Sequence, residues 1–239
     1  MTKHIFTIGL LLSISFCFAD TIKLPDGSKF IGSLKNGLFD GTGEVIWSNG
    51  ETYKGNFLKG RYNGDGKLKS TLYNYEGNFE NGLFNGKGKI TFTNGIVYQG
   101  DFKDGLYNGK GALSDNIGNT YVGDFINHIK KGVGYAQYMT GDTYSGNFDN
   151  DCFYGKGVYT YANGDQYMGE FRNGLFDGFG TLTTADKKRF EGVFIKGEFP
   201  DKYTRNKGES IINISLLLLL LVISFIGNVF MFLKLKKKI

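Results

Sequence analysis

The residue types that carry out most enzyme chemistry are scarce in this chain. Its 239 residues include two His and two Cys. His4 and Cys17 lie in an N-terminal segment that we expect to be removed, so His128 and Cys152 would remain. A Cys/His zinc site and an intrachain disulfide are then excluded from the mature chain. Cys152 would be either a half-buried thiol or one half of an intermolecular disulfide.

Three further sequence patterns could support catalysis or ligand binding, but each is a weak match. Gly-x-Gly occurs seven times, but a phosphate loop needs a following helix, and nothing after these glycines has helical periodicity. Asp149-Asn150-Asp151 lacks the acidic spacing and the closing Glu of a calcium loop. A Ser-His-Asp triad would need His128, and no strained-turn serine motif is present. We therefore predict a non-enzymatic protein with no catalytic residue, no metal site and no cofactor.

The positions that do recur are aromatic residues and glycines at a fixed period. An aromatic-x-Gly element returns eight times at intervals of 22 or 23 residues, and nearly every copy is followed by a Gly-x-Gly. The first and last copies begin at Phe30 and Phe190. The six between them form the repeat signature: Tyr53, Gly55 and Phe57; Tyr75, Gly77 and Phe79; Tyr98, Gly100 and Phe102; Tyr121, Gly123 and Phe125; Tyr144, Gly146 and Phe148; Tyr167, Gly169 and Phe171.

Each repeat predicts a β-hairpin. The stretch Tyr53 to Phe57 alternates aromatic or glycine with polar residues, which is the period of a strand with one apolar face. We expect Lys59 to Gly64 to form the turn and Gly66 to Ser70 the returning strand. Between repeats we expect tight turns with positive φ at Asn49-Gly50, Asn94-Gly95 and Asn163-Gly164. Because glycine inside a strand costs conformational entropy, these glycines are predicted to give aromatic rings room to lie across the backbone and stack from repeat to repeat.

The unit Tyr-x-Gly-x-Phe-x-x-Gly-x-x-x-Gly-x-Gly resembles the MORN (membrane occupation and recognition nexus) repeat from about Phe30 to Phe199. The resemblance implies an all-β fold, an elongated single-layer antiparallel sheet of stacked hairpins. About seven full repeats with partial ends would fill residues 20–199. Leu24-Pro25-Asp26-Gly27 is expected to act as a half-repeat that caps the N-terminal edge.

Two residues depart from the repeat pattern. His128 and Asp151 occupy positions where most repeats have Gly. One interpretation is a small polar site on adjacent hairpins. The other, which we favour, is that both residues are tolerated at a left-handed turn position.

The two ends of the chain have the character of targeting segments. Residues 1–19 are predicted to be a secretory signal peptide. Residues 211–233 contain no charged residue and would form a C-terminal transmembrane helix, joined to the repeats by a linker at 200–210. The basic tail, residues 234–239, would stay in the cytosol, which makes the chain a single-pass type I protein. Lys236 and Lys237 also resemble a dilysine retrieval signal, although any lysine-rich stop-transfer tail would look the same.

The formal charge of +5 belongs to the two ends, because the 23 Lys or Arg between Asp20 and Ser210 are balanced by 23 Asp or Glu. The charge therefore gives no reason to expect a nucleic-acid partner. Our leading hypothesis is a membrane-anchored scaffold on the luminal or extracytoplasmic side. It would assemble unidentified proteins or further copies of itself, in the endoplasmic reticulum or another secretory membrane of a eukaryote or the cell membrane of a bacterium. The alternatives are an accessory subunit of a membrane enzyme complex and a phospholipid-binding module, whose candidate lipid contacts are Lys130, Lys131, Lys187, Lys188 and Arg189.

Overall fold

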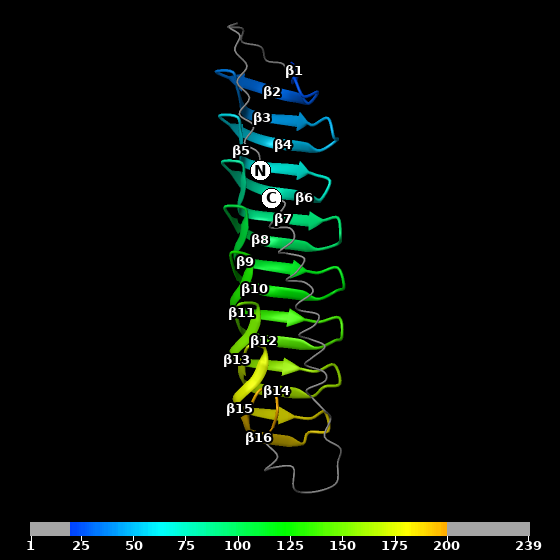
Figure 1. The fold of residues 1–239 in the computed structure, drawn as a ribbon, viewed down its shortest axis with the longest axis vertical. Coiled ribbons are helices and arrows are strands. Elements are labelled where there is room, and N and C mark those ends of the chain that lie inside the picture. Colours follow the sequence, from blue (N-terminus) through cyan, green and yellow to red (C-terminus); the bar gives the residue numbers. More distant parts are fainter. Residues whose placement is uncertain (1–19, 200–239) are drawn as a thin grey trace. The chain divides into compact units, whose positions relative to one another are not determined.

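The computed structural model describes residues 20–199, and these residues form strands and turns without a helix. The order of the strands in the sheet is their order in the chain, and the pairing is antiparallel (Figure 1). The all-β fold is therefore confirmed. The strands are β1 (Asp20–Lys23), β2 (Lys29–Lys35), β3 (Leu38–Ile46), β4 (Thr52–Leu58), β5 (Arg61–Lys69), β6 (Tyr73–Glu80), β7 (Leu83–Phe92), β8 (Val97–Lys103), β9 (Leu106–Ser114), β10 (Thr120–Ile126), β11 (Ile129–Gln137), β12 (Thr143–Asp149), β13 (Cys152–Thr160), β14 (Gln166–Arg172), β15 (Leu175–Thr183) and β16 (Arg189–Phe194).

The predicted targeting segments lie outside the described residues. This applies to the signal peptide at 1–19, the linker at 200–210, the transmembrane helix at 211–233 and the tail at 234–239. Between residues 20 and 199, no helix has the length and apolar character needed to cross a membrane.

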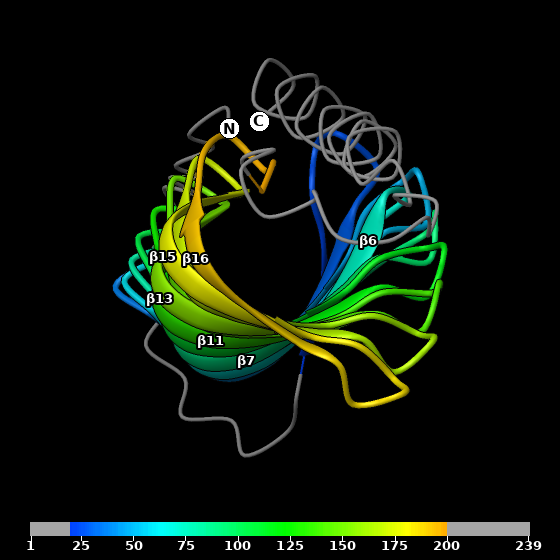
Figure 2. The same ribbon diagram turned by 90° about the horizontal axis from the view of Figure 1, so that it is seen from below.

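The chain divides into two compact units, Thr2–Ile129 and Lys130–Ile239. Of the first unit, which we call the N-terminal unit, residues 20–129 are described. Of the second, the C-terminal unit, residues 130–199 are described. Each unit is a run of antiparallel hairpins whose strands are bent rather than flat (Figure 2).

The turn within each hairpin is shorter than the sequence predicts. Lys59 and Gly60 alone form it, with φ of 50° and 77°, and β5 begins at the next residue. Two successive residues with positive φ form the type I′ turn that suits the twist of a two-residue hairpin. Gly64 also has a positive φ, of 85°, but lies inside β5, where the register shifts between Gly55 and Phe57. The prediction of a turn reaching to Gly64 is therefore wrong, because the positive φ there lies within a bulged strand.

The connection between hairpins is the longer one. Trp47 donates its amide hydrogen to the carbonyl oxygen of Glu51, and Gly50 donates to that of Trp47, both at 3.0 Å. Gly50 has a φ of 84°, as predicted, but five residues separate β3 from β4, so this turn is not the tight one. Leu24 and Gly27 repeat the same two hydrogen bonds before β2, with β1 paired to β2. The expected half-repeat at the N-terminal edge is present.

One face of each unit holds the aromatic core. Tyr98 is fully buried although the sheet has a single layer, because its ring lies against the backbone of two glycines, Gly100 on its own strand and Gly111 on the next. A methyl group added at Gly111 would come within 2.5 Å of the ring. This is the close approach that the sequence predicts for the glycines within strands.

The rings stack within a hairpin rather than between hairpins. Tyr98 lies parallel to Tyr107 of the same hairpin, with centroids 3.6 Å apart. Its contact with the next hairpin is edge-on, to Phe125 at 5.2 Å. The prediction of stacking from repeat to repeat is therefore corrected. The Tyr98 ring leans across Gly100 and Gly111 and so meets the ring of the residue nine positions later, whose own register partner is Phe102. The same parallel pair recurs at Phe30 and Phe39, Tyr53 and Tyr62, Tyr75 and Phe84, Tyr144 and Phe153, and Tyr167 and Phe176.

Candidate interaction surface

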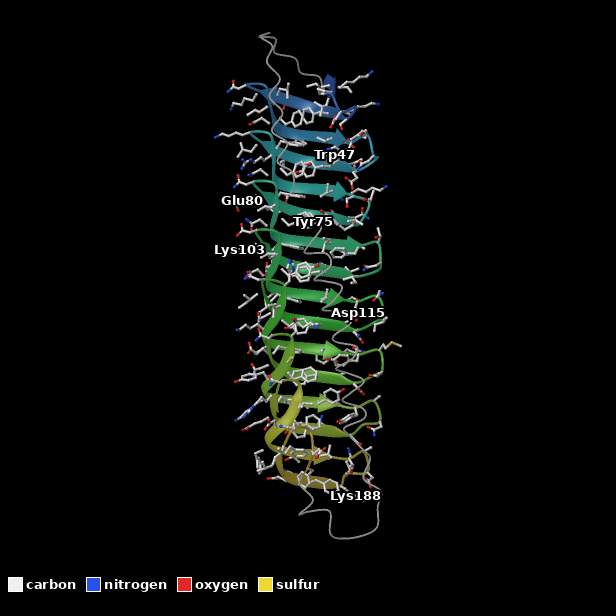
Figure 3. All side chains as sticks on the ribbon, viewed as in Figure 1. Trp47, Tyr75, Glu80, Lys103, Asp115 and Lys188 are labelled. Atoms are coloured by element: carbon white, nitrogen blue, oxygen red, sulfur yellow. The ribbon has the colours of Figure 1, made fainter. Side chains whose placement is uncertain are left out.

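The repeat signature residues form the core of the sheet's aromatic face. All six signature tyrosines are almost completely buried, and each donates its hydroxyl hydrogen to the backbone carbonyl of the residue directly after the signature Gly, as Tyr98 does to Asp101 at 2.8 Å. Burial raises the pKa of Tyr98 well above the usual tyrosine value, and the nearby carboxylate of Asp101 adds to this effect. A buried, protonated and hydrogen-bonded phenol of this kind is a structural group. The surface available for binding is therefore the opposite face of the sheet and the two sets of loops (Figure 3).

His128 and Asp151 each support a turn. Both have positive φ, 72° and 66°, as the second residue of a two-residue turn. Nδ1 of His128 accepts a hydrogen bond from the amide of Tyr107 at 3.3 Å, and Oδ1 of Asp151 accepts one from the amide of Lys130 at 2.9 Å. Burial raises the pKa of the Asp151 carboxyl, while the hydrogen bond from Lys130 opposes that shift. Each side chain thus joins its own turn to the hairpin before it, which favours the structural interpretation.

The longer loops carry a second kind of link between hairpins, which the sequence analysis missed. Asp142 is buried, and its carboxylate accepts hydrogen bonds from the Tyr159 hydroxyl and the Ala162 amide, both at 2.8 Å. Burial and this hydrogen bond raise the pKa of Tyr159. Glu51 accepts from the amide of Thr71 at 2.9 Å in the same manner. In the sequence, Glu51 and Asp142 each directly follow the glycine of a longer loop, and this recurring acidic position could have predicted the link.

Three of the five candidate lipid contacts are already paired with carboxylates. Lys131 lies 3.2 Å from Asp149, and Lys188 lies 3.1 Å from Asp186 in the loop between β15 and β16. Arg189 lies 2.8 Å from Glu191. Lys130 is the second residue of β11, and Lys187 has a φ of 68° in the same loop as Lys188.

Cys152 begins β13 and is partly buried. Burial is the main cause that raises the pKa of its thiol, and the neighbouring carboxylates of Asp151 and Asp149 raise it further. A protonated thiol is a poor nucleophile. Among residues 20–199, His, Cys, Asp and Glu side chains do not form any group of three that could hold a metal ion.

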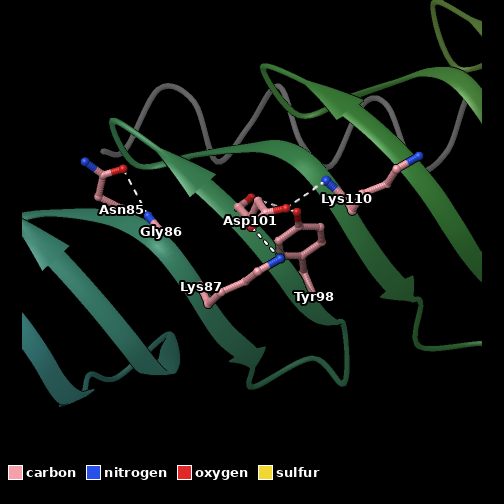
Figure 4. Close-up of polar contacts among 6 residues, drawn as sticks. All are labelled: Asn85, Gly86, Lys87, Tyr98, Asp101 and Lys110. Atoms are coloured by element: carbon pink, nitrogen blue, oxygen red, sulfur yellow. Dashed lines mark hydrogen bonds and ion pairs between the residues drawn. The ribbon is translucent and has the colours of Figure 1, made fainter.

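The outward face, opposite the aromatic core, carries a charged ladder in the N-terminal unit. Lys87 lies 2.6 Å from Asp101, its register partner on the next strand, and Asp101 also accepts a hydrogen bond from the Lys110 amide at 3.0 Å (Figure 4). Lys110 in turn lies 2.6 Å from Asp124. The same cross-strand arrangement occurs at Glu44 with Lys54 and at Lys67 with Glu76.

On the outward face of the C-terminal unit, Lys156 and Glu170 continue the ladder as register partners, and two other cross-strand pairs are apolar. Val158 on β13 is the register partner of Met168 on β14, and Phe179 on β15 is the partner of Val193 on β16. Met168, Phe179 and Val193 are 57%, 55% and 54% exposed. We call Val158, Met168, Phe179 and Val193 the outward apolar patch. Strand alternation places all four on the face opposite Tyr167 and Phe176.

The family model for the MORN repeat matches residues 30–52, 53–71, 75–97, 98–120, 144–166 and 167–189, which together make up more than half of the chain. The match omits residues 121–143, the repeat in which Lys130 stands at the position of the second stacked aromatic. No curated protein matches the chain significantly.

Two solved structures are distantly similar to the chain. The first is the TCP domain of SAS-4 (dCPAP) of Drosophila melanogaster, in complex with a proline-rich motif of Ana2 (dSTIL). It is 18% identical, the match covers 78% of this chain and 98% of that one, and the TM-score is 0.35. The second is the wild-type TCP10 domain of CPAP from Danio rerio, with 13% identity, coverage of 73% and 100%, and a TM-score of 0.25. With TM-scores this low, neither likeness extends to function.

Proposed function

The chain belongs to the MORN repeat family, and from this premise we propose that it is a membrane-anchored, non-enzymatic scaffold that assembles proteins beside a membrane. The observation that supports the proposal is that the two faces of the sheet differ. The aromatic face is occupied by its own packing, whereas the outward face is a regular array of exposed side chains whose chemistry varies along the chain.

Apolar side chains exposed together on a folded surface usually mark a protein interface or a membrane contact. Lipid recognition is the weaker of these two functions for this chain. Lys131, Lys188 and Arg189 are neutralised by Asp or Glu partners, and the residues 130–199 contain eight Lys or Arg against nine Asp or Glu. Attraction to an anionic membrane requires an excess of positive charge.

The anchoring part of the proposal rests on the apolar segment 211–233 and the lysines that follow it. This arrangement would hold the repeats on the luminal or extracytoplasmic side, joined to the bilayer by residues 200–210.

The test is extraction and protease protection of the full chain in membranes of an expressing cell. The chain should stay in the membrane pellet at alkaline pH in carbonate, and the repeats should resist protease until the membrane is opened by detergent. A variant with Leu217 and Leu220 both changed to Arg is the matched control and should be released by carbonate, because charge at the centre of a span is costly. Release of the unaltered chain by carbonate would refute anchoring.

A further inference from the structure

The bulge of β7 holds an Asn-Gly pair whose asparagine side chain lies against its own backbone. The register with β6 shifts here, so that residues 85–87 lie opposite the single residue Asn78. Within the bulge, the amide of Gly86 donates its hydrogen to Oδ1 of Asn85, the residue directly before it, at 3.0 Å (Figure 4). Nδ2 of Asn85 donates in turn to Glu80 on β6, which holds the carboxamide in this orientation. Asn85 is half-buried and Gly86 is exposed, so water reaches the pair.

We propose that Asn85 is a site of spontaneous deamidation, in which the backbone nitrogen of Gly86 attacks the side-chain carbon Cγ of Asn85. Cγ is bonded to Oδ1 at about 1.2 Å, so the Gly86 nitrogen, 3.0 Å from Oδ1, lies within about 4.2 Å of Cγ. Reacting atoms in a near-attack arrangement are ~3–3.5 Å apart, which a small rotation of the side chain supplies. The inference goes beyond the proposed function and does not depend on membrane anchoring.

The reaction balances with water as the only co-reactant. The Gly86 amide loses its proton to hydroxide, and its nitrogen forms a bond to Cγ of Asn85. The bond from Cγ to Nδ2 breaks, and Nδ2 leaves as ammonia after taking up a proton from water, which closes a five-membered succinimide ring. Water then opens the ring at either carbonyl carbon and gives aspartate or isoaspartate. Glycine favours the attack, because no Cβ obstructs its nitrogen.

Four other Asn-Gly pairs direct the asparagine side chain elsewhere. In the longer loops, Oδ1 accepts a hydrogen bond from the amide two residues further on, at 3.0, 3.2 and 2.9 Å for Asn49, Asn94 and Asn163. Asn108 occupies the position of Asn85 in the next repeat and also precedes a glycine. Its Nδ2 donates to Asn127 of the following hairpin at 3.2 Å. Asn85 therefore differs from these residues in side-chain geometry, although the dipeptide is the same.

The surroundings of Asn85 make the product unfavourable. In β15 the same position holds Asp177, whose Oδ2 lies 3.8 Å from Nε of Arg172, five residues earlier. The residue five positions before Asn85 is Glu80 instead. Deamidation therefore sets two carboxylates side by side across the tight turn that joins β6 to β7, and like charges in this relation are destabilising. An isoaspartate also lengthens the backbone of β7 by one carbon atom, which disturbs its register.

The experiment is peptide mapping of the purified full chain by tandem mass spectrometry during incubation in detergent at mildly alkaline pH. Asn85 should deamidate severalfold faster than Asn108 in the folded chain, and its rate should rise with pH. A protein isoaspartyl methyltransferase should detect the isoaspartate. In concentrated urea the two residues should react at about equal rates, because each lies in an aromatic-Asn-Gly-Lys segment and the folded geometry is gone.

Two variants test the positioning role of Glu80. Glu80→Ala removes the acceptor that orients the carboxamide and should slow the deamidation of Asn85 severalfold, with that of Asn108 unchanged. Glu80→Gln retains an acceptor oxygen and should keep the faster rate. Circular dichroism of each variant separates a change of orientation from a loss of fold.

Three outcomes would overturn parts of this inference. Equal rates at Asn85 and Asn108 in the folded chain would refute the site, and this comparison needs no substitution. A faster rate at Asn85 that persists in urea would assign the reaction to local sequence rather than to the fold. An unchanged rate in a folded Glu80→Ala chain would refute the positioning by Glu80.

Discussion

The contact of the Tyr98 ring with glycine is the feature on which the aromatic core depends, and Gly111→Ala tests it directly. The new methyl group would lie 2.5 Å from Cε2 and from the hydroxyl oxygen of Tyr98. The ring cannot yield easily, because it is fully buried and lies 3.6 Å from the ring of Tyr107. The substitution must therefore shift the ring, the backbone or both.

The magnitude follows from three contributions. Overpacking of a filled core costs about 1–3 kcal/mol. If the ring moves, the hydrogen bond from Tyr98 to the carbonyl oxygen of Asp101 is weakened, at about 1 kcal/mol. The lower entropy of the unfolded chain returns about 0.4–1 kcal/mol when alanine replaces glycine. We expect Gly111→Ala to lower the free energy of unfolding by about 2–3 kcal/mol.

The assay is urea unfolding of the full chain in detergent, followed by circular dichroism. Gly105→Ala is the control: no atom lies within 4 Å of the added methyl group, so the cost there is only that of a φ of 82°, about 1–2 kcal/mol. In a Tyr98→Leu background, Gly111→Ala should cost much less, because the atoms that it meets are gone. An equal cost of Gly111→Ala in both backgrounds would refute the reasoning.

Three further substitutions test other links. Asp142→Ala leaves the buried Tyr159 hydroxyl without its acceptor and should lower the free energy of unfolding by about 1–3 kcal/mol, whereas Tyr159→Phe should cost less, both measured by urea unfolding. Glu51 has a lowered pKa in the folded chain, chiefly because its carboxylate accepts a hydrogen bond from a backbone amide of the next loop. Its contribution to stability is therefore present above the ordinary glutamate pKa of about 4.3. That contribution is lost as the pH falls through the lower pKa of the folded chain. The melting temperature should therefore fall more steeply below that pH in the unaltered chain than in Glu51→Gln, and parallel curves would exclude the link. Lys130→Phe restores the aromatic residue that is buried or half-buried at this position of the other repeats, and it should raise the free energy of unfolding by about 0.5–2 kcal/mol, again by urea titration. A lower stability of that variant would show that Lys130 is favoured where it is.

The sequence predicts the hairpin repeat because its period is formed by aromatic residues and glycines, whose spacing fits a ring lying across the backbone of a strand. A glycine two residues after an aromatic residue has no Cβ to block the ring, and this requirement is local enough to read from spacing alone. The position of the tight turn could not be read in the same way. Both connections contain a glycine, and the two-residue turn at Lys59-Gly60 is distinguished only by the bulge at Gly64, which depends on strand register.

The outward apolar patch was missed for a different reason. Its residues lie between the positions that define the repeat, so they vary without disturbing the period. Met168 and Phe179 come to share one face only when β14 and β15 pair in the observed register, in which Met168 lies opposite Thr181. Read as a separate series, the residue after each signature tyrosine is Lys54, Glu76, Gln99, Val122, Ser145 and Met168, so this row of the outward face carries charge only in its first two members.

The separation of the two faces has a consequence for how the surface can be tested. Tyr167, Phe171 and Phe176 contact one another on the aromatic face, while Phe179 and Val193 point away from them. Substitutions on the outward face thus share few partners with the core, and their effects on stability should add independently of core substitutions. A change of Phe179, which is 55% exposed, to Glu should consequently alter the outward face with little change in the free energy of unfolding. A repeat array built in this way can acquire a new binding surface by changing outward residues alone, because the glycine and ring layer that holds each hairpin together is left untouched.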